Sequence, residues 1–179
     1  MEFVHKENRD FISLEHYLTD LCLENISIIK KKRIDNLMTT EQTRPTVTVG
    51  PLIFNKEGKL FLMQSPKWHN KWVIPGGKIE LGETMEHAVK REIKEETNLD
   101  LENIQFLTVL ENIFDPVFVK KKHFIHLNFT AKAKNFENVI LNEEAIAHKW
   151  VTLEEAEKMD LEPYTRKLIA IYQKKHKKN

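Results

Sequence analysis

The chain has 179 residues, of which 41% are hydrophobic and 31% charged, and its formal net charge is +1. This composition is typical of a soluble globular protein, and the length suits one domain with a sizeable core and some extension. A net charge so close to zero gives no overall field that would attract nucleic acid or a membrane surface. The N-terminus lacks the apolar segment of a signal peptide, and no apolar run is long enough to span a membrane.

Cys22 is the only cysteine of the chain. It excludes an intramolecular disulfide and a zinc site built from several cysteines, and it fits a reducing compartment. We therefore expect a cytoplasmic protein.

The first 44 residues are predicted to form an N-terminal extension. Apolar side chains recur at helical spacing and predict an amphipathic helix over residues 10–24: Phe11, Leu14, Leu18, Leu21 and Cys22. The polar stretch "MTTEQTRP" then marks a boundary, so we expect an N-terminal helical extension over 1–44 and the main domain over 45–179.

The main domain alternates strand and helix patterns. Residues 46–54 and 59–65 are strand-like and are joined by the hairpin signal "NKEG", and "KWVI" then leads into the turn Pro75-Gly76-Gly77. Residues 84–97 form a helix with an apolar stripe, from which the glutamates are expected to point away: Met85, Ala88, Val89 and Ile93.

Further strands are expected over 104–114, 123–133 and 148–153, followed by a short helix over 153–159 and a C-terminal helix over 164–176. This order indicates an α/β fold in which helices cover both faces of a mixed central sheet.

Three glutamates of the helix, Glu92, Glu95 and Glu96, lie three and four residues apart and therefore on one helical face. Such a cluster is most often a solvated acidic surface. Here Gly76 and Gly77 precede it, and a backbone without Cβ atoms can approach another group closely. Hard oxygen ligands in such a cluster suit Mg²⁺ or Mn²⁺, which commonly take their remaining ligands from substrate phosphates.

The spacing of these residues resembles the Nudix box, G-x5-E-x7-R-E-U-x-E-E-x-G-U, where U is a bulky aliphatic residue. The chain matches it at Gly77 and at every charged position: Glu83, Arg91, Glu92, Glu95 and Glu96. It departs at Asn98, where the family usually has a glycine that ends the helix. Asn is the next most tolerant residue there, so we expect a small stability cost and unchanged chemistry. The resemblance covers roughly residues 45–175.

This resemblance implies an α/β/α sandwich and a hydrolase that cleaves a nucleoside diphosphate linked to another group. It also implies that Glu92, Glu95 and Glu96 ligate Mg²⁺ or Mn²⁺, with the carbonyl of Gly76 as a further ligand. The base that accepts the proton of the attacking water would then be Glu92, Glu96, Glu143 or Glu144. Glu83 and Arg91 are expected to pair structurally, and Gly77 to serve as a turn position.

Two aromatic residues are candidates for contact with the substrate: Trp68, in a loop near the expected site, and Phe118, beside the basic run "KKKHF". His123 and His126 are too isolated for a zinc site, and their spacing along a strand places them on opposite faces.

The expected partner is a small nucleotide, with neither a membrane nor nucleic acid involved, and a homodimer is left open. The first expectation for the substrate is a nucleoside triphosphate or an oxidised nucleotide. An ADP-ribose or nucleotide-sugar pyrophosphatase is the alternative within the family. A non-catalytic Nudix-like domain that binds nucleotide or RNA is the alternative of another class, although the chain retains all four glutamates of the box.

Overall fold

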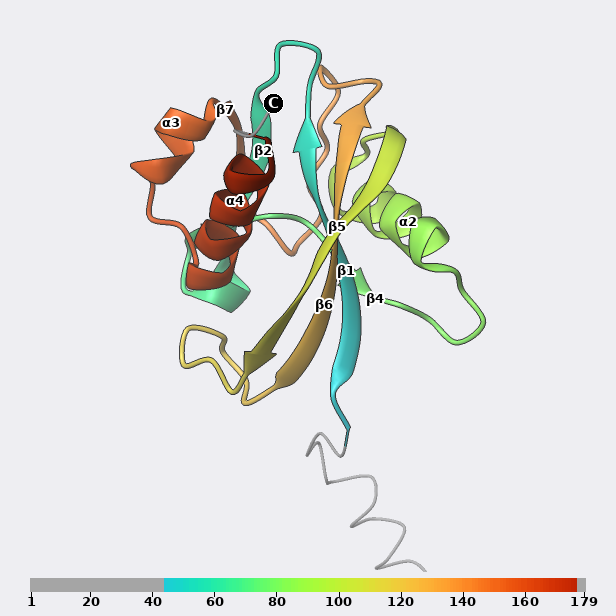
Figure 1. The fold of residues 1–179 in the computed structure, drawn as a ribbon, viewed down its shortest axis with the longest axis vertical. Coiled ribbons are helices and arrows are strands. Elements are labelled where there is room, and N and C mark those ends of the chain that lie inside the picture. Colours follow the sequence, from blue (N-terminus) through green and yellow to red (C-terminus); the bar gives the residue numbers. More distant parts are fainter. Residues whose placement is uncertain (1–43, 177–179) are drawn as a thin grey trace, which may run out of the picture. The chain divides into compact units, whose positions relative to one another are not determined.

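The computed structural model describes residues 44–176, which lie in one compact unit of the chain, Gln42–Asn179 (Figure 1). The helix expected over residues 10–24 and Cys22 lie outside the described residues. The elements follow one another in this order: β1 (Thr46–Phe54), β2 (Leu60–Ser65), the 3₁₀ turn η1 (Pro66–Trp68), β3 (Lys71–Val73), β4 (Gly77–Lys78), α2 (Met85–Thr97), β5 (Leu101–Ile113), β6 (His123–Ala133), β7 (Ala147–Val151), α3 (Leu153–Glu157) and α4 (Pro163–His176).

The seven strands form one mixed sheet in which β1 is central. The path β3-β2-β1-β6-β5 is extended by β4, which pairs with β1, and by β7, which pairs with β2. The pairings between the named strands are antiparallel except that of β1 with β6, which is parallel and places Thr48 beside His126. This parallel pairing joins the segment before the Gly-Gly turn to a strand that comes more than seventy residues later.

Successive side chains of β2 point to opposite faces of the sheet, so they belong to two separate layers of the core. Phe61 and Met63 pack on one face of the sheet with Val89 and Ile93 of α2. Leu60 and Leu62 point to the other face, toward Leu168 of α4. Successive side chains of a strand point to opposite faces, so a strand buried on both sides is apolar throughout. Helices therefore cover both faces of the sheet, as Figure 1 shows, and the expected α/β/α sandwich is confirmed.

Helix α2 has clear signals at both ends. The Thr84 side chain accepts a hydrogen bond from the amide of His87 at 3.2 Å and caps the N-terminus. Asn98 ends the helix in the left-handed conformation, with φ of 60°, and its amide donates to the carbonyl of Lys94. Asn thus takes the conformation that the usual glycine of the box would take.

Two expectations for this helix are wrong. Met85 is 47% exposed, because it is the first residue of the helix and lies beyond the packed stripe. Glu96 is only 3% exposed, although the glutamates were expected to point away from the core. It follows Val89 by seven residues and Ile93 by three, so helical periodicity places it on the buried face.

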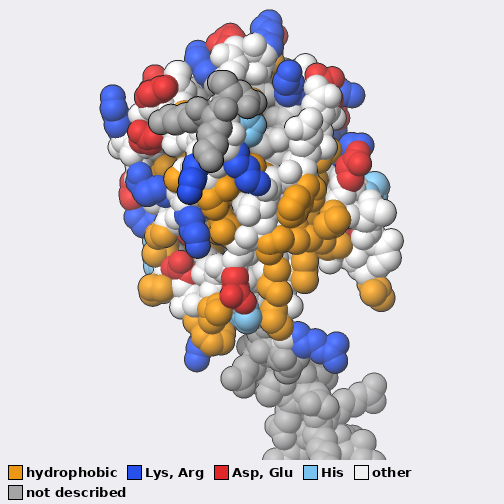
Figure 2. Space-filling model, in the orientation of Figure 1, with side chains coloured by type: hydrophobic (Ala, Val, Ile, Leu, Met, Phe, Trp, Pro, Cys, Tyr) orange, Lys and Arg blue, Asp and Glu red, His pale blue; other side chains and the backbone are white. Residues whose placement is uncertain are grey.

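Strand β5 ends one side of the sheet and carries three exposed apolar side chains, Phe106, Val109 and Ile113. Val47 of β1 and Phe114, just after β5, are also exposed. Figure 2 shows a hydrophobic area on this face of the molecule. Among the helices of residues 44–176, none is both long and apolar enough to cross a membrane.

Candidate active site

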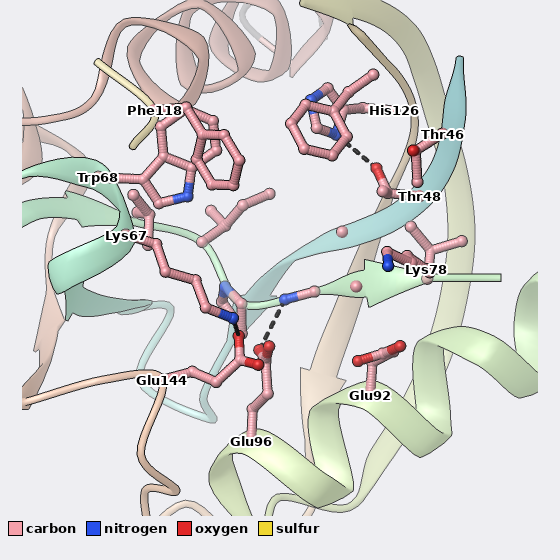
Figure 3. Close-up of a pocket in the computed structure, with 18 of the residues that line it drawn as sticks. Thr46, Thr48, Lys67, Trp68, Lys78, Glu92, Glu96, Phe118, His126 and Glu144 are labelled. Carbon is pink, nitrogen blue, oxygen red and sulfur yellow. Dashed lines mark hydrogen bonds and ion pairs between the residues drawn. The ribbon is translucent and has the colours of Figure 1, made fainter. Parts of the chain in front are cut away.

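A cleft of about 700 Å³ opens between α2 and the sheet (Figure 3). Its walls come from β1, the turn around Pro75, the η1 turn, the loop between β5 and β6, and the start of α4. Glu92, Glu95 and Glu96 line one side of this cleft, so the structure places the three box glutamates in one cavity.

The two glycines of the turn fit tightly against these carboxylates. The amide of Gly76 donates to Oε2 of Glu96 at 2.9 Å. A Cβ atom built on Gly77 would lie 2.2 Å from Oε2 of Glu92, closer than real contacts allow. Gly76 has a φ of 148°, and a Cβ there would lie 2.2 Å from the carbonyl oxygen of Val49. The absence of a side chain at Gly77 therefore lets the turn approach Glu92 of α2, and its absence at Gly76 lets the turn pack against the backbone of β1.

Burial raises the pKa of two carboxylates on the α2 side of the cleft. It raises the pKa of Glu96 to about 8, against the opposing hydrogen bond from Gly76, and the nearby Glu144 and Glu92 carboxylates add to the rise. The pKa of Glu92 is also raised by burial, which Arg91 opposes. A carboxylate kept from water favours its neutral form unless a cation offsets the charge.

Arg91 provides part of that offset. Its guanidinium donates from Nε and Nη2 to the two carboxylate oxygens of Glu83, both at 2.8 Å. Nη1 reaches Glu92 Oε1 at 3.0 Å and Glu95 Oε2 at 3.2 Å, and Nη2 also donates to the carbonyl of Lys78. The ion pair expected between Glu83 and Arg91 is therefore present. It joins the loop before α2 to β4 and to two of the clustered glutamates.

Glu83 is well held in this network. Its side chain is 7% exposed, and the hydrogen bond from Arg91 lowers its pKa to about 2. Glu95, by contrast, is 58% exposed and contacts only the edge of the guanidinium.

The donor set suits a hard divalent cation, since carboxylate oxygens are the ligands that Mg²⁺ and Mn²⁺ prefer. Across residues 44–176, however, no three acidic, histidine or cysteine side chains are already gathered into a metal site. Arg91 holds Glu92 and Glu95, and the amide of Gly76 holds Glu96. A cation would therefore have to take Glu92 and Glu95 from Arg91.

The two glutamates outside the box are placed differently. Glu144 lines the cleft and forms an ion pair with Lys67, whereas Glu143 is exposed and does not line it. Asn142 fixes the turn that carries Glu144. Its side-chain oxygen accepts from the backbone amide of Glu144 at 2.9 Å, and its backbone amide donates to the backbone carbonyl of Glu96. Figure 3 shows the carboxylates of Glu144 and Glu96 side by side.

Aromatic rings in mutual contact line the cleft away from the glutamates. Trp68 lies 4.5 Å from Phe118 between ring centroids, and His126 lies 4.2 Å from Tyr164. The chain of contacts runs through five lining residues: Trp68, Phe118, Phe124, His126 and Tyr164. Both aromatic residues expected near the substrate, Trp68 and Phe118, thus lie in the cleft.

Within this wall the ring of His126 is uncharged at neutral pH, because burial lowers its pKa to about 4. Its Nδ1 shares a hydrogen bond of 2.6 Å with the hydroxyl of Thr48 on β1. Three lysines also line the cleft, and no ion pair involves them within the described part of the chain: Lys78, Lys120 and Lys122.

The sequence interpretation missed several of these lining residues. Phe124 and His126 alternate along β6 and so share one face, a signal that period-two spacing does give. Lys67 and Tyr164 lie in different elements that meet only in the folded chain, and no local pattern connects them.

The fold agrees with comparisons to known proteins. The family model described as the NUDIX domain matches residues 44–171. Nucleoside triphosphatase NudI of Enterobacter sp. (strain 638) is 31% identical over 137 residues, which cover 69% of this chain and 93% of that protein. Nudix hydrolase 5 of Arabidopsis thaliana is 29% identical over 113 residues, which cover 61% of this chain but only 37% of the plant protein.

Among solved structures, the MutT protein from Methanosarcina mazei Go1 superposes with a TM-score of 0.63 and 25% identity. The match covers 76% of this chain and 99% of that one. The matched family model spans the sheet, the box glutamates and most of α4. The chain belongs to the Nudix hydrolase family.

Proposed function

We propose that the protein is a divalent-metal-dependent hydrolase that cleaves a phosphoanhydride of a nucleoside triphosphate or an oxidised nucleotide. The observation that carries this proposal is the composition of one cleft. A carboxylate wall on α2 faces a wall of aromatic rings, and lysines without ion pairs in residues 44–176 lie at the same cavity. Such a cavity suits a ligand that has both phosphates and a planar base.

In this proposal Glu92, Glu95 and Glu96 hold Mg²⁺ or Mn²⁺, with the carbonyl of Gly76 as a further ligand. Such a cation, when bound, withdraws charge from phosphate oxygens and lowers the pKa of a bound water. The side chain of Glu95 is the most exposed of the three and can turn toward a ligand at little cost. Glu83 and Arg91 fix the loop between β4 and α2 against the helix, and Arg91 also holds the carbonyl of Lys78 in β4.

Glu144 is the residue that we assign as the proton acceptor. Glu92 and Glu96 serve as metal ligands in this proposal, whereas Glu144 lines the cleft with its side chain 37% exposed and is held by an exposed ion pair with Lys67. It would take the proton of the water that attacks phosphorus. Glu143 is exposed and does not line the cleft, so we assign it no such role.

The aromatic wall supports a nucleotide substrate. A base can stack on Trp68 or Phe118, since stacking requires only a planar face and contributes about 1–3 kcal/mol per base. The relative NudI, similar over most of its length, is named a nucleoside triphosphatase, which supports the triphosphate over a nucleotide sugar.

The test is a panel of nucleotides with Mg²⁺ or Mn²⁺, including ordinary nucleoside triphosphates, 8-oxo-dGTP and ADP-ribose. We expect release of phosphate or pyrophosphate from a triphosphate, loss of that release in chelator, and its return with excess metal. Full turnover in chelator would contradict the metal requirement. Failure to hydrolyse any nucleotide would favour the non-catalytic binding domain.

A further inference from the structure

Lys67 and Glu144 form an ion pair inside the cleft, and neither side chain is locked there by burial. The side chains are 47% and 37% exposed, respectively, and both residues line the cavity. Figure 3 shows the Lys67 side chain extending from η1 to the carboxylate of Glu144, next to Glu96. The pair therefore lies beside the group of glutamates to which a phosphate chain would be directed.

The backbones of both residues are held more firmly than their side chains. The carbonyl of Lys67 accepts from the amide of Val119 at 3.1 Å, which fastens η1 to the loop between β5 and β6. The turn with Glu144 is fastened to α2 through Asn142. Lys67 can thus exchange its partner by side-chain rotation alone, while the walls of the cleft stay in place.

The other cations of the cleft lack this combination. Arg91 is 20% exposed and holds Glu83 with two parallel hydrogen bonds, a rigid geometry that suits a structural pair. Lys78, Lys120 and Lys122 line the cleft, but they are in no ion pair within residues 44–176. Lys67 alone among these lining lysines is bound to a carboxylate of the cleft.

We propose that Lys67 is a phosphate-binding residue, which Glu144 holds in the ligand-free protein and which the substrate's polyphosphate takes over. An exposed ion pair contributes only about 0–1 kcal/mol, so it gives way to a stronger anion. The ammonium of lysine is a mobile point charge with three donors, and a polyphosphate carries more negative charge than one carboxylate. The exchange also releases the carboxylate of Glu144. This inference rests on the proposed function only in that the ligand is a polyphosphate.

Competition between the two anions makes a distinctive prediction for binding. Removing Lys67 should weaken the binding of a polyphosphate, because a cation is lost. Removing the charge of Glu144 should strengthen it, because Lys67 no longer has to leave a partner. The second effect should require the presence of Lys67.

Calorimetric titration of inorganic tripolyphosphate with Mg²⁺ tests this competition on the full chain. Lys67→Met should weaken binding by about tenfold or more, as expected for the loss of one hydrogen bond to a charged group. Lys67→Arg should restore most of it. Glu144→Gln should tighten binding severalfold, and the double variant should bind like Lys67→Met.

The matched control is Lys71→Met. Lys71 is four residues away, forms a 2.6 Å ion pair with Asp160 and does not line the cleft, so its removal should leave binding unchanged. Melting curves of all variants verify that each is folded. Wild-type binding by Lys67→Met, weaker binding by Glu144→Gln, or no binding by the wild type would each overturn the inference.

Hydrolysis measured beside binding separates this inference from the proposed function. If the wild type hydrolyses no nucleotide but the binding pattern holds, the proposed function fails and the role of Lys67 stands. If the wild type hydrolyses a triphosphate and Lys67→Met has the same KM and the same tripolyphosphate affinity, the role of Lys67 fails and the proposed function stands.

Discussion

At the scale of single residues, Glu83 and Glu95 contact the same guanidinium but are held very differently. Glu83 takes two short hydrogen bonds from Arg91 and is almost completely buried, whereas Glu95 contacts Arg91 at 3.2 Å from an exposed position. Because Arg91 also holds Glu92, it offsets part of the repulsion within the cluster of carboxylates when no metal is bound.

Glu83→Gln and Glu95→Gln should therefore have opposite signatures. Glu83→Gln should lower the melting temperature of the metal-free protein, because it breaks the charge-assisted pair with Arg91. Glu95→Gln should leave that temperature unchanged or slightly higher. It should lower hydrolysis by at least about a hundredfold, about 2.7 kcal/mol of barrier, because a charged ligand is lost. Melting curves with and without Mg²⁺, beside the rates, measure both effects. The assignment is wrong if Glu95→Gln destabilises the protein as Glu83→Gln does and hydrolysis persists.

His126 should make stability depend on pH. Its folded pKa of about 4 lies below the ordinary value of 6.5 because the ring is buried. The folded state therefore prefers the neutral ring, so this stabilisation is complete above pH 6.5 and is lost as the pH falls toward 4. Across that window the stability of the wild type relative to His126→Gln should fall by about 3 kcal/mol. Urea unfolding of both proteins at pH 7, 5.5 and 4 measures the difference, and a constant difference would contradict the buried neutral ring.

The sequence revealed individual residues only where spacing carried the information. Glu92, Glu95, Glu96 and Arg91 were predicted because they lie at fixed intervals along one helix, and Glu83 because it lies at a fixed interval before them. The burial of Glu96 was missed because the helix was judged by its apolar residues alone, although its spacing from Val89 placed it on the same face. The contact of Lys67 with Glu144 joins residues 77 positions apart, and no local pattern predicts such a pair.

At the scale of elements, the end of α2 depends on one residue with a positive φ. Asn98 occupies the left-handed region and also donates from its side chain to the carbonyl of Asn138 at 3.3 Å. Its position links the end of the helix to the segment after β6, so the substitution of this residue tests both features.

Asn98→Gly should keep hydrolysis and change the free energy of unfolding by no more than about 1 kcal/mol, because glycine adopts the same conformation without strain. Asn98→Val should destabilise by about 1–2 kcal/mol, since a β-branched side chain is strained in the left-handed region. Denaturant midpoints at unchanged slope give both values. A loss of hydrolysis by orders of magnitude in Asn98→Gly would show that the amide side chain has a role in the site.

Most elements were predictable because their signals are local. The hairpin of β1 and β2 followed from "NKEG", and the structure shows Phe54 opposite Leu60 with Gly58 at a positive φ. The two-residue strand β4 and the parallel pairing of β1 with β6 were not predicted. Period-two alternation shows which face of a strand is buried, but it does not show which strand is the neighbour or in which direction it runs.

At the scale of the whole molecule, the described residues contain a seven-stranded sheet with a layer of core on each face. The clusters on the two faces extend from Val49 to Tyr172, and the family match begins at residue 44. The assignment of residues 1–44 as an extension, separate from the domain over 45–179, remains a proposal.

A chain that begins at Arg44 should fold and keep hydrolysing nucleotide, because the lining residues found in the described part of the chain all follow it. Circular dichroism melting and the hydrolysis rate, compared with the full chain, measure the effect of removal. A truncated protein that folds but does not hydrolyse would show that the first 43 residues complete the site.

The parallel pairing of β1 with β6 has a consequence for synthesis on the ribosome. β2 can pair with β1 as soon as the hairpin emerges, but β6 begins only at His123, so the other edge of β1 waits for a much longer chain. Domains are made from the N-terminus at about 5–20 residues per second, and unpaired strand edges invite aggregation. The cleft requires a still longer nascent chain, since one of its lining residues, Tyr164, belongs to the last helix. A nascent chain therefore contains the glutamates of α2 well before it contains all the aromatic residues of the cleft. Substrate that contacts both groups can stabilise only the finished protein.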